Sequence, residues 1–179
     1  MCRNIALLLT VIFLAVPPVA VSQSTRLGDI HEDIQVEYSK VSHIDADEFG
    51  ELSSAEIIVF DVREQKEYAV SHLNGAIQVS PGISATDFMM QFGDQLDGKT
   101  AVFYCSVGRR SSDLVNRLVS DPEIGEENTL FNLEGGMFSW VNERREIDGT
   151  GIHPYNWYWS FLIEDKSMIQ YDTTKEIDE

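Results

Sequence analysis

The segment YCSVGRRSS, residues 104–112, contains residue types whose spacing suits covalent chemistry. Cys105 follows an apolar run, and Gly108, Arg109 and Arg110 come within five positions of it. A glycine adopts positive φ at little cost, so the backbone can curl around the sulfur and direct several N–H groups at it. These dipoles and the guanidinium charges lower a thiol pKa and favour the nucleophilic thiolate. We therefore predict a catalytic Cys105 with a substrate-binding loop formed by Ser106, Val107, Gly108, Arg109 and Arg110.

The N-terminal residues have the three-part pattern of a secretory signal. Residues 1–4 carry one positive charge, residues 5–16 are apolar, and prolines and small residues follow. Ala20 and Ser22 suit the small positions before a cleavage site, which we place after Ser22. The alternative is a retained membrane anchor, but a helix of this run spans only about 18 Å against a hydrocarbon core of roughly 30 Å. We expect residues 1–22 to be a signal peptide and the chain to be exported, to a periplasm.

Export changes the interpretation of the cysteines. The chain has two, and Cys2 would be removed with the signal, which leaves Cys105 without a disulfide partner. A single thiol in an oxidising compartment is either buried as a packing residue or used in chemistry.

Composition limits the classes of partner. The chain has 179 residues, 43% of them hydrophobic, which suits one domain with a proper core. Its formal net charge of −17 opposes binding to nucleic acid and, after signal cleavage, to anionic membranes. None of the histidines at 31, 43, 72 and 153 has ligand spacing with another or with Cys105, so we expect no metal site and no cofactor.

The elements that must position the loop alternate between strand and helix. Short apolar runs predict strands at 56–62, 76–80, 100–105 and 128–133, with an edge strand at 36–43. Helical patterns occupy 44–54, 63–73, 84–96, 111–121 and 137–145, and residues 23–35 form a loose polar lead-in. The alternation predicts an α/β fold with a central parallel sheet. Cys105 ends its most apolar strand, at the sheet edge where ligands bind.

Three motifs in order resemble those of the rhodanese family. The loop matches its Cys-x-x-Gly-x-Arg pattern with Cys105, Gly108 and Arg110. Residues 60–76 match its Asp-x-Arg-x-x-x-Glu and His-x-x-Gly-Ala patterns with Asp61, Arg63, Glu67, His72, Gly75 and Ala76. Residues 133–140 match its Leu-x-Gly-Gly-x-x-x-Trp pattern with Leu133, Gly135, Gly136 and Trp140. Ser71 departs from the family, which usually has glycine there. The chain is identified as a member, with the domain at residues 36–146.

The resemblance implies a five-stranded parallel sheet with helices on both faces and a sulfurtransferase chemistry. Cys105 would take sulfane sulfur from a small anionic donor, thiosulfate-like or a persulfide, and pass it to a thiol or cyanide acceptor. Phosphatases of a related fold are a rival, but they place the phosphate-binding arginine six positions after the cysteine, where this chain has Ser111. A reversible redox sensor is a weaker alternative because no resolving cysteine is present.

Charged residues near the loop leave two interpretations open. Asp61 and Arg63 are supporting residues, either near the loop or, as we favour, paired to fix a β–α turn. Arg110 either contacts substrate or braces the loop by pairing with an acid. We expect Arg109 to be exposed and to help steer anions, so that the loop forms a locally positive mouth.

Residues 147–179 form a C-terminal extension that is rich in aromatic residues between 153 and 163. Aromatic side chains at this density are seldom left in water, so the extension should pack on the domain or line the mouth of the site. The alternative is that 153–163 docks a protein partner, and a non-catalytic binding or sulfur-carrier module is the corresponding alternative function.

Overall fold

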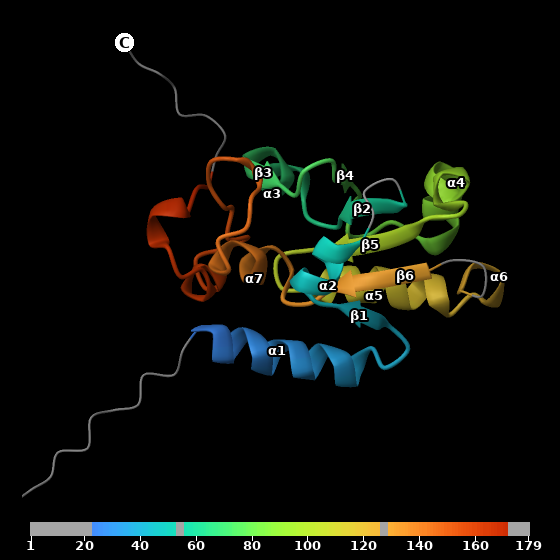
Figure 1. Ribbon diagram of the computed structural model, residues 1–179, viewed down its shortest axis with the longest axis horizontal. Helices are drawn as coiled ribbons and strands as arrows, with labels where there is room; N and C mark the ends of the chain where they lie inside the picture. Colours follow the sequence, from blue (N-terminus) through green and yellow to red (C-terminus); the bar gives the residue numbers. More distant parts are fainter. Residues whose placement is uncertain (1–22, 53–55, 126–128, 172–179) are drawn as a thin grey trace, which may run out of the picture.

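The computed structural model describes residues 23–52, 56–125 and 129–171. A five-stranded sheet lies at its centre, with strand order β1-β6-β5-β2-β4 and every pairing parallel (Figure 1). The strands are β1 (Ser42–Ile44), β2 (Ile57–Asp61), β4 (Ile77–Gln78), β5 (Thr100–Tyr104) and β6 (Thr129–Leu133). The predicted α/β class and five-stranded parallel sheet are confirmed.

Apolar residues on both faces of the sheet explain why its strands lack polar alternation. On β5, Val102 and Tyr104 belong to one hydrophobic cluster, and Ala101 and Phe103 belong to another. Successive side chains of a strand point to opposite faces, so a strand covered on both sides must be apolar throughout. The first cluster includes residues of α7 (Gly136–Asn142), and the second includes residues of α4 (Ala85–Leu96), α5 (Arg109–Val119) and α6 (Pro122–Gly125).

Two short helices follow the first two strands of the chain, β1 and β2. α2 (Ala46–Glu51) begins where the Asp45 carboxylate accepts hydrogen bonds from the N–H groups of Asp47 and Glu48. α3 (Gln65–Val70) follows β2, and its Glu67 side chain is fully buried.

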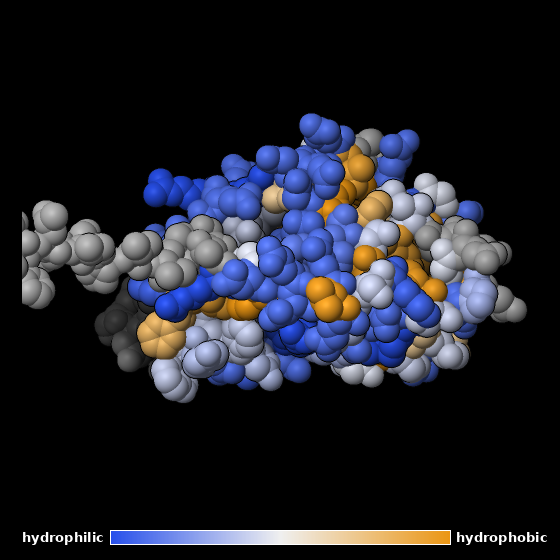
Figure 2. Space-filling view, turned by 90° about the horizontal axis from the view of Figure 1, so that it is seen from below, coloured by the Kyte–Doolittle hydropathy of each residue, from blue (hydrophilic) through white to orange (hydrophobic). Residues whose placement is uncertain are grey.

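The predicted loose lead-in at 23–35 is wrong, because these residues belong to helix α1 (Gln23–Glu37). Leu27 and Ile34 are buried, and Ile30 packs beside them on the first cluster. Their spacing of three and four positions forms an apolar stripe inside a polar segment, which is the pattern of a surface helix. The predicted edge strand is correspondingly shorter and is confined to β1. The face of the molecule on the α1 side is mostly hydrophilic (Figure 2).

A second, two-stranded sheet joins the domain to the C-terminal extension. β3 (Ser71–His72) pairs antiparallel with β7 (Asp148–Gly149), a pairing that the sequence did not predict. Two 3₁₀ helices follow, η1 (Trp159–Leu162) and η2 (Lys166–Met168), beside α7 (Figure 1). Ile152 and Ile163 are fully buried in the first cluster. The extension therefore packs on the domain.

The predicted signal peptide, residues 1–22, lies outside the described residues. Within the ranges that the structure describes, no helix combines the length and apolar character needed to cross a bilayer.

Candidate active site

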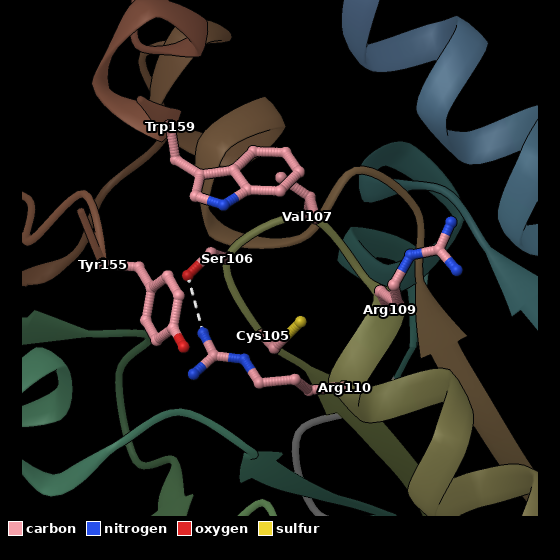
Figure 3. Close-up of a pocket in the computed structure, with 7 residues that line it drawn as sticks. All are labelled: Cys105, Ser106, Val107, Arg109, Arg110, Tyr155 and Trp159. Atoms are coloured by element: carbon pink, nitrogen blue, oxygen red, sulfur yellow. Dashed lines mark hydrogen bonds between the residues drawn. The ribbon is translucent and has the colours of Figure 1, made fainter. Parts of the chain in front are cut away.

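The loop from Cys105 to Gly108 connects β5 to α5 and curls around the Cys105 sulfur (Figure 3). Gly108 has φ +97°, in the left-handed region, and its N–H donates to Cys105 Sγ at 3.2 Å. This conformation is the one that the sequence predicted for the glycine. Cys105 is only 1% exposed. It nevertheless lines a cavity and belongs to neither hydrophobic cluster.

The N-terminus of α7 is hydrogen-bonded to the loop. The N–H of Met137 donates to the Cys105 carbonyl at 2.8 Å, and the N–H of Phe138 donates to the Ser106 carbonyl at 3.0 Å. Gly136, with φ +55°, lies so close that an added Cβ would be 2.3 Å from the Cys105 carbonyl oxygen. The paired glycines therefore permit close backbone contact, and they place α7 directly against the cysteine loop.

The environment of Cys105 favours its ionised form. Burial of the thiol opposes ionisation, but the positive charge of Arg110 and hydrogen bonds from the backbone N–H groups of Ser111 and Val107 outweigh it. The pKa of Cys105 therefore lies below its usual value. This is the electrostatic effect predicted from the sequence for the loop amides and the neighbouring guanidinium.

Arg110 pairs with a buried carboxylate. Its two terminal nitrogens donate to both oxygens of Glu67 at 2.7 and 2.9 Å, and Nη2 also donates to Ser106 Oγ at 2.9 Å. Burial of Glu67 raises its pKa, but the Arg110 hydrogen bonds and charge outweigh that effect and lower it. Arg110 thus braces the loop, which is one of the two roles that the sequence left open. Glu67 was not predicted as a site residue. Its position in the Asp-x-Arg-x-x-x-Glu motif was the signal that could have identified it.

Arg109 forms an ion pair with Glu37 at the end of α1. Its side chain is 44% exposed, as expected for this residue, and Figure 3 shows it pointing away from the sulfur. Both arginines of the loop therefore have acidic partners. The positive charge predicted for the mouth of the site is partly offset, because folding brings Glu37 and Glu67 from distant positions to the two guanidinium groups.

Asp61 and Arg63 form a fully buried ion pair at 2.6 Å. Arg63 also donates to the Ser71 carbonyl, and the Tyr104 hydroxyl donates to Asp61 at 2.6 Å. Neither Asp61 nor Arg63 lines the cavity above Cys105. The pair fixes the turn between β2 and α3, which is the role that the sequence favoured.

A cavity of about 160 Å³ opens above Cys105. Two aromatic residues of the C-terminal extension form part of its wall, and Figure 3 shows Trp159 beside Val107 and Tyr155 beside the Arg110 guanidinium. The Arg110 guanidinium carbon lies 4.9 Å from the Tyr155 ring centroid. The lining residues are Cys105, Ser106, Val107, Arg109, Arg110, Tyr155 and Trp159. Gly108, which was predicted to bind substrate, does not line the cavity. Its N–H is directed at the Cys105 sulfur.

Within the described parts of the chain, no group of three or more His, Cys, Asp or Glu residues is arranged to hold a metal ion. The geometry instead suits a nucleophile whose charge is held by main-chain amides and one guanidinium.

Comparison with known proteins places this geometry in a family. A curated relative, tRNA uridine(34) hydroxylase of Staphylococcus haemolyticus, is 29% identical over 116 residues, which are 62% of this chain and 34% of the relative. The chain thus spans about a third of the length of that relative.

Two solved structures are similar to the chain at low sequence identity, and the first of them has the same fold. Thiosulfate sulfurtransferase from Pseudomonas aeruginosa is 16% identical, with a TM-score of 0.54, over 76% of this chain and 26% of that one. A rhodanese-related protein from Thermoplasma volcanium is 21% identical, with a TM-score of 0.46, over 59% of this chain and 96% of that one. Residues 45–143, more than half of the chain, match the Rhodanese-like domain family. The chain therefore belongs to the rhodanese-like domain family.

Proposed function

We propose that the protein is a sulfurtransferase that moves sulfane sulfur through a persulfide on Cys105. The observation that carries this proposal is a single thiol with a lowered pKa, at the floor of an open cavity, with the Gly108 N–H directed at its sulfur. A thiolate in a ring of amide dipoles is both a nucleophile and a group whose charged persulfide those dipoles stabilise.

The reaction takes two displacements at sulfur. The Cys105 thiolate attacks the sulfane sulfur of a donor, a new S–S bond forms to Cys105, and the donor's bond to that sulfur breaks. The leaving group departs with the bonding electron pair. An acceptor thiolate or cyanide then attacks the outer sulfur of the persulfide, and the Cys105 thiolate is released for another cycle.

The rival phosphatase chemistry is less well supported by the loop. Ser111 occupies the position where a phosphatase of related fold has its arginine, and the Ser111 hydroxyl donates to Asn132 at 2.6 Å. Arg110 is one position earlier and is held by Glu67. RNA as a substrate is also disfavoured, since the net charge of −17 repels a polyanion.

Mass spectrometry of the intact protein after incubation with thiosulfate or inorganic polysulfide tests the proposal. We expect the mass to rise by one sulfur atom, and the adduct to be lost on treatment with cyanide or a thiol. Cys105→Ser should show no adduct under the same conditions. Absence of a Cys105-dependent adduct with every sulfane donor would exclude the sulfurtransferase function.

A binding or sulfur-carrier module is the second candidate, and exposed aromatic side chains favour it. Trp157 and Tyr158 in the 153–163 segment are 68% and 65% exposed. Such a module would retain a stable complex with a protein partner while showing negligible turnover.

We also propose that the chain is exported to a periplasm, with residues 1–22 as its signal peptide and Cys105 as its remaining thiol.

A further inference from the structure

The cavity wall contains residues that lie beyond the matched family domain. The domain match ends at residue 143, whereas Tyr155 and Trp159 come from the C-terminal extension. The position of Trp159 is stabilised by its own segment, where the N–H groups of Tyr158 and Trp159 donate to Asn156 Oδ1. The segment is also attached to α7, since Asn142 Nδ2 donates to the Leu162 carbonyl at 2.8 Å. The aromatic wall is therefore a built part of this site.

The size of the cavity limits what can reach the sulfur. Its volume is about 160 Å³. An apolar protein cavity of about 150 Å³ accepts a molecule the size of benzene. The cavity therefore suits one small ring or a short branched chain beside Cys105, and Val107, Tyr155 and Trp159 offer such a group apolar contact.

The charges of the cavity disfavour a doubly charged ligand. Among the lining residues, all of which the structure describes, Arg109 and Arg110 are the two cations. Arg109 is paired with Glu37, and Arg110 is shared between Glu67 and the Cys105 thiolate. A dianion that entered would lose hydration and gain only guanidinium groups that already have acidic partners, so loading of Cys105 by thiosulfate or inorganic polysulfide should need an excess of donor.

We propose that the sulfur carrier which binds here is a small organic thiol with an uncharged, apolar or aromatic side group, held between Tyr155 and Trp159. It acts as donor in its persulfide form and as acceptor in its thiol form. This inference rests on the proposed sulfurtransferase function and specifies its substrate class.

Sulfur transfer to Cys105 and sulfur transfer from Cys105 use the same binding position, and the atoms balance in each reaction. As donor, R–S–SH is attacked by the Cys105 thiolate at the outer sulfur. The carrier S–S bond breaks, RS⁻ leaves with the electron pair, and the transferred sulfur keeps its proton. As acceptor, RS⁻ attacks the outer sulfur of the Cys105 persulfide, R–S–SH forms, and the Cys105 thiolate is released. No external oxidant or reductant is required.

The test measures sulfur transfer from the full-length protein after Cys105 is loaded with inorganic polysulfide. Phenylmethanethiol is compared with 2-mercaptoethanesulfonate, a charged thiol, at equal thiolate concentrations. We expect the apolar thiol to react at least about tenfold faster at low concentration, with the difference mainly in KM, because uniform binding contacts lower KM.

Variants separate the aromatic wall from the rest of the segment. Tyr155→Ala and Trp159→Ala should each reduce transfer to phenylmethanethiol by about tenfold and leave transfer to the charged thiol nearly unchanged. Trp157→Ala is the matched control, since Trp157 is exposed and does not line the cavity. Tyr155 lies outside the hydrophobic clusters, so its variant remains informative if Trp159→Ala fails to fold.

The outcomes distinguish the two proposals. If Cys105 loads but both thiols react equally, or if Tyr155→Ala behaves like Trp157→Ala, the substrate class is wrong and the sulfurtransferase function stands. If Cys105 accepts no sulfur from polysulfide or any other sulfane donor, the proposed function and this inference both fail.

Discussion

At Cys105, two opposing electrostatic effects act on one sulfur atom. Removal from water favours the neutral thiol, while the Arg110 charge and the loop amides favour the thiolate, and the second effect is the larger. The Gly108 amide is directed at the sulfur because the glycine adopts positive φ. Reactivity at this residue therefore depends on a backbone conformation and one side-chain charge, with no histidine among the causes of the pKa shift.

The charge of Arg110 gives a prediction at the scale of the residue. Arg110→Gln removes the largest effect that lowers the Cys105 pKa, so the pKa should rise and the alkylation profile should move to higher pH. Below the wild-type midpoint, the rate with iodoacetamide should fall on the order of tenfold, since a nearby opposite charge lowers a pKa by roughly 1–3 units.

Arg109→Gln is the matched control for this measurement. Arg109 is adjacent in sequence and also paired with an acid, but it points away from the sulfur (Figure 3). Its profile should overlay that of the wild type. Equal shifts in both variants would show that Arg110 has no special influence on the thiol.

Among the elements, α7 constrains the site by direct backbone contact with the cysteine loop. Helix α7 begins at Gly136, and its first N–H groups bond to the carbonyls of Cys105 and Ser106. The closeness of the two backbones is possible only where no Cβ intervenes. The same helix carries Asn142, which is bonded to the extension, so one element supports both the loop and the aromatic wall.

Gly136→Ala should therefore disrupt the site and the fold together. The left-handed conformation of a non-glycine residue costs about 1–3 kcal/mol, and the new Cβ would clash with the Cys105 carbonyl. We expect a lower free energy of unfolding in urea and slower sulfur loading.

Gly50→Ala is the control, because Gly50 lies in α2 and an added Cβ meets nothing within 4 Å. This substitution should leave stability unchanged or raise it by up to about 1 kcal/mol. Similar stabilities for the Gly136 and Gly50 variants would contradict the proposed backbone contact.

At the scale of the whole molecule, the net negative charge and the ion pairs at the active site both affect the binding of anions. The chain has 30 acidic and 13 basic residues, so its long-range field repels anions. Within the described residues, the arginines at the active site are held by acids from α1 and α3. A dianion therefore meets both a repulsive long-range field and guanidinium groups that already have acidic partners, which supports the proposal of an uncharged carrier.

The stability of the molecule should decrease in acid through His43. Burial and the nearby His31 ring lower the pKa of His43 from 6.5 to about 4. Between pH 6.5 and 4 the unfolded chain binds a proton at this position that the folded chain does not. The free energy of unfolding therefore falls as the pH decreases through that range.

His43→Gln should reduce this loss, and urea unfolding at pH 7, 5.5 and 4 measures it at constant ionic strength. The comparison is the slope of stability against pH in the variant and the wild type, since carboxylates contribute equally to both. Identical slopes would show that His43 does not titrate between the two states in this range.

Local pattern determined the strands, the loop and the nucleophile. The apolar cores of the runs at 56–62 and 100–105, residues 57–60 and 101–103, show no polar alternation, which suits strands covered on both faces. The spacing of Cys105, Gly108 and Arg110 placed a reactive loop after the second of them. The Asp45 cap of α2 and the helical stripe of α4 also follow from interactions between near neighbours in the chain. Such features depend on side-chain periodicity and backbone preference, which are legible in a sequence.

Only the tertiary structure decided the partners of that loop. Glu67 and Arg110 are 43 positions apart, and Glu37 and Arg109 are 72 apart, so their pairing depends on how α1, α3 and α5 pack around the sheet. The same packing brought Tyr155 and Trp159 over Cys105. Burial energy is shared by surfaces distant in the chain, so no local pattern specifies which charge meets which, or what walls the cavity.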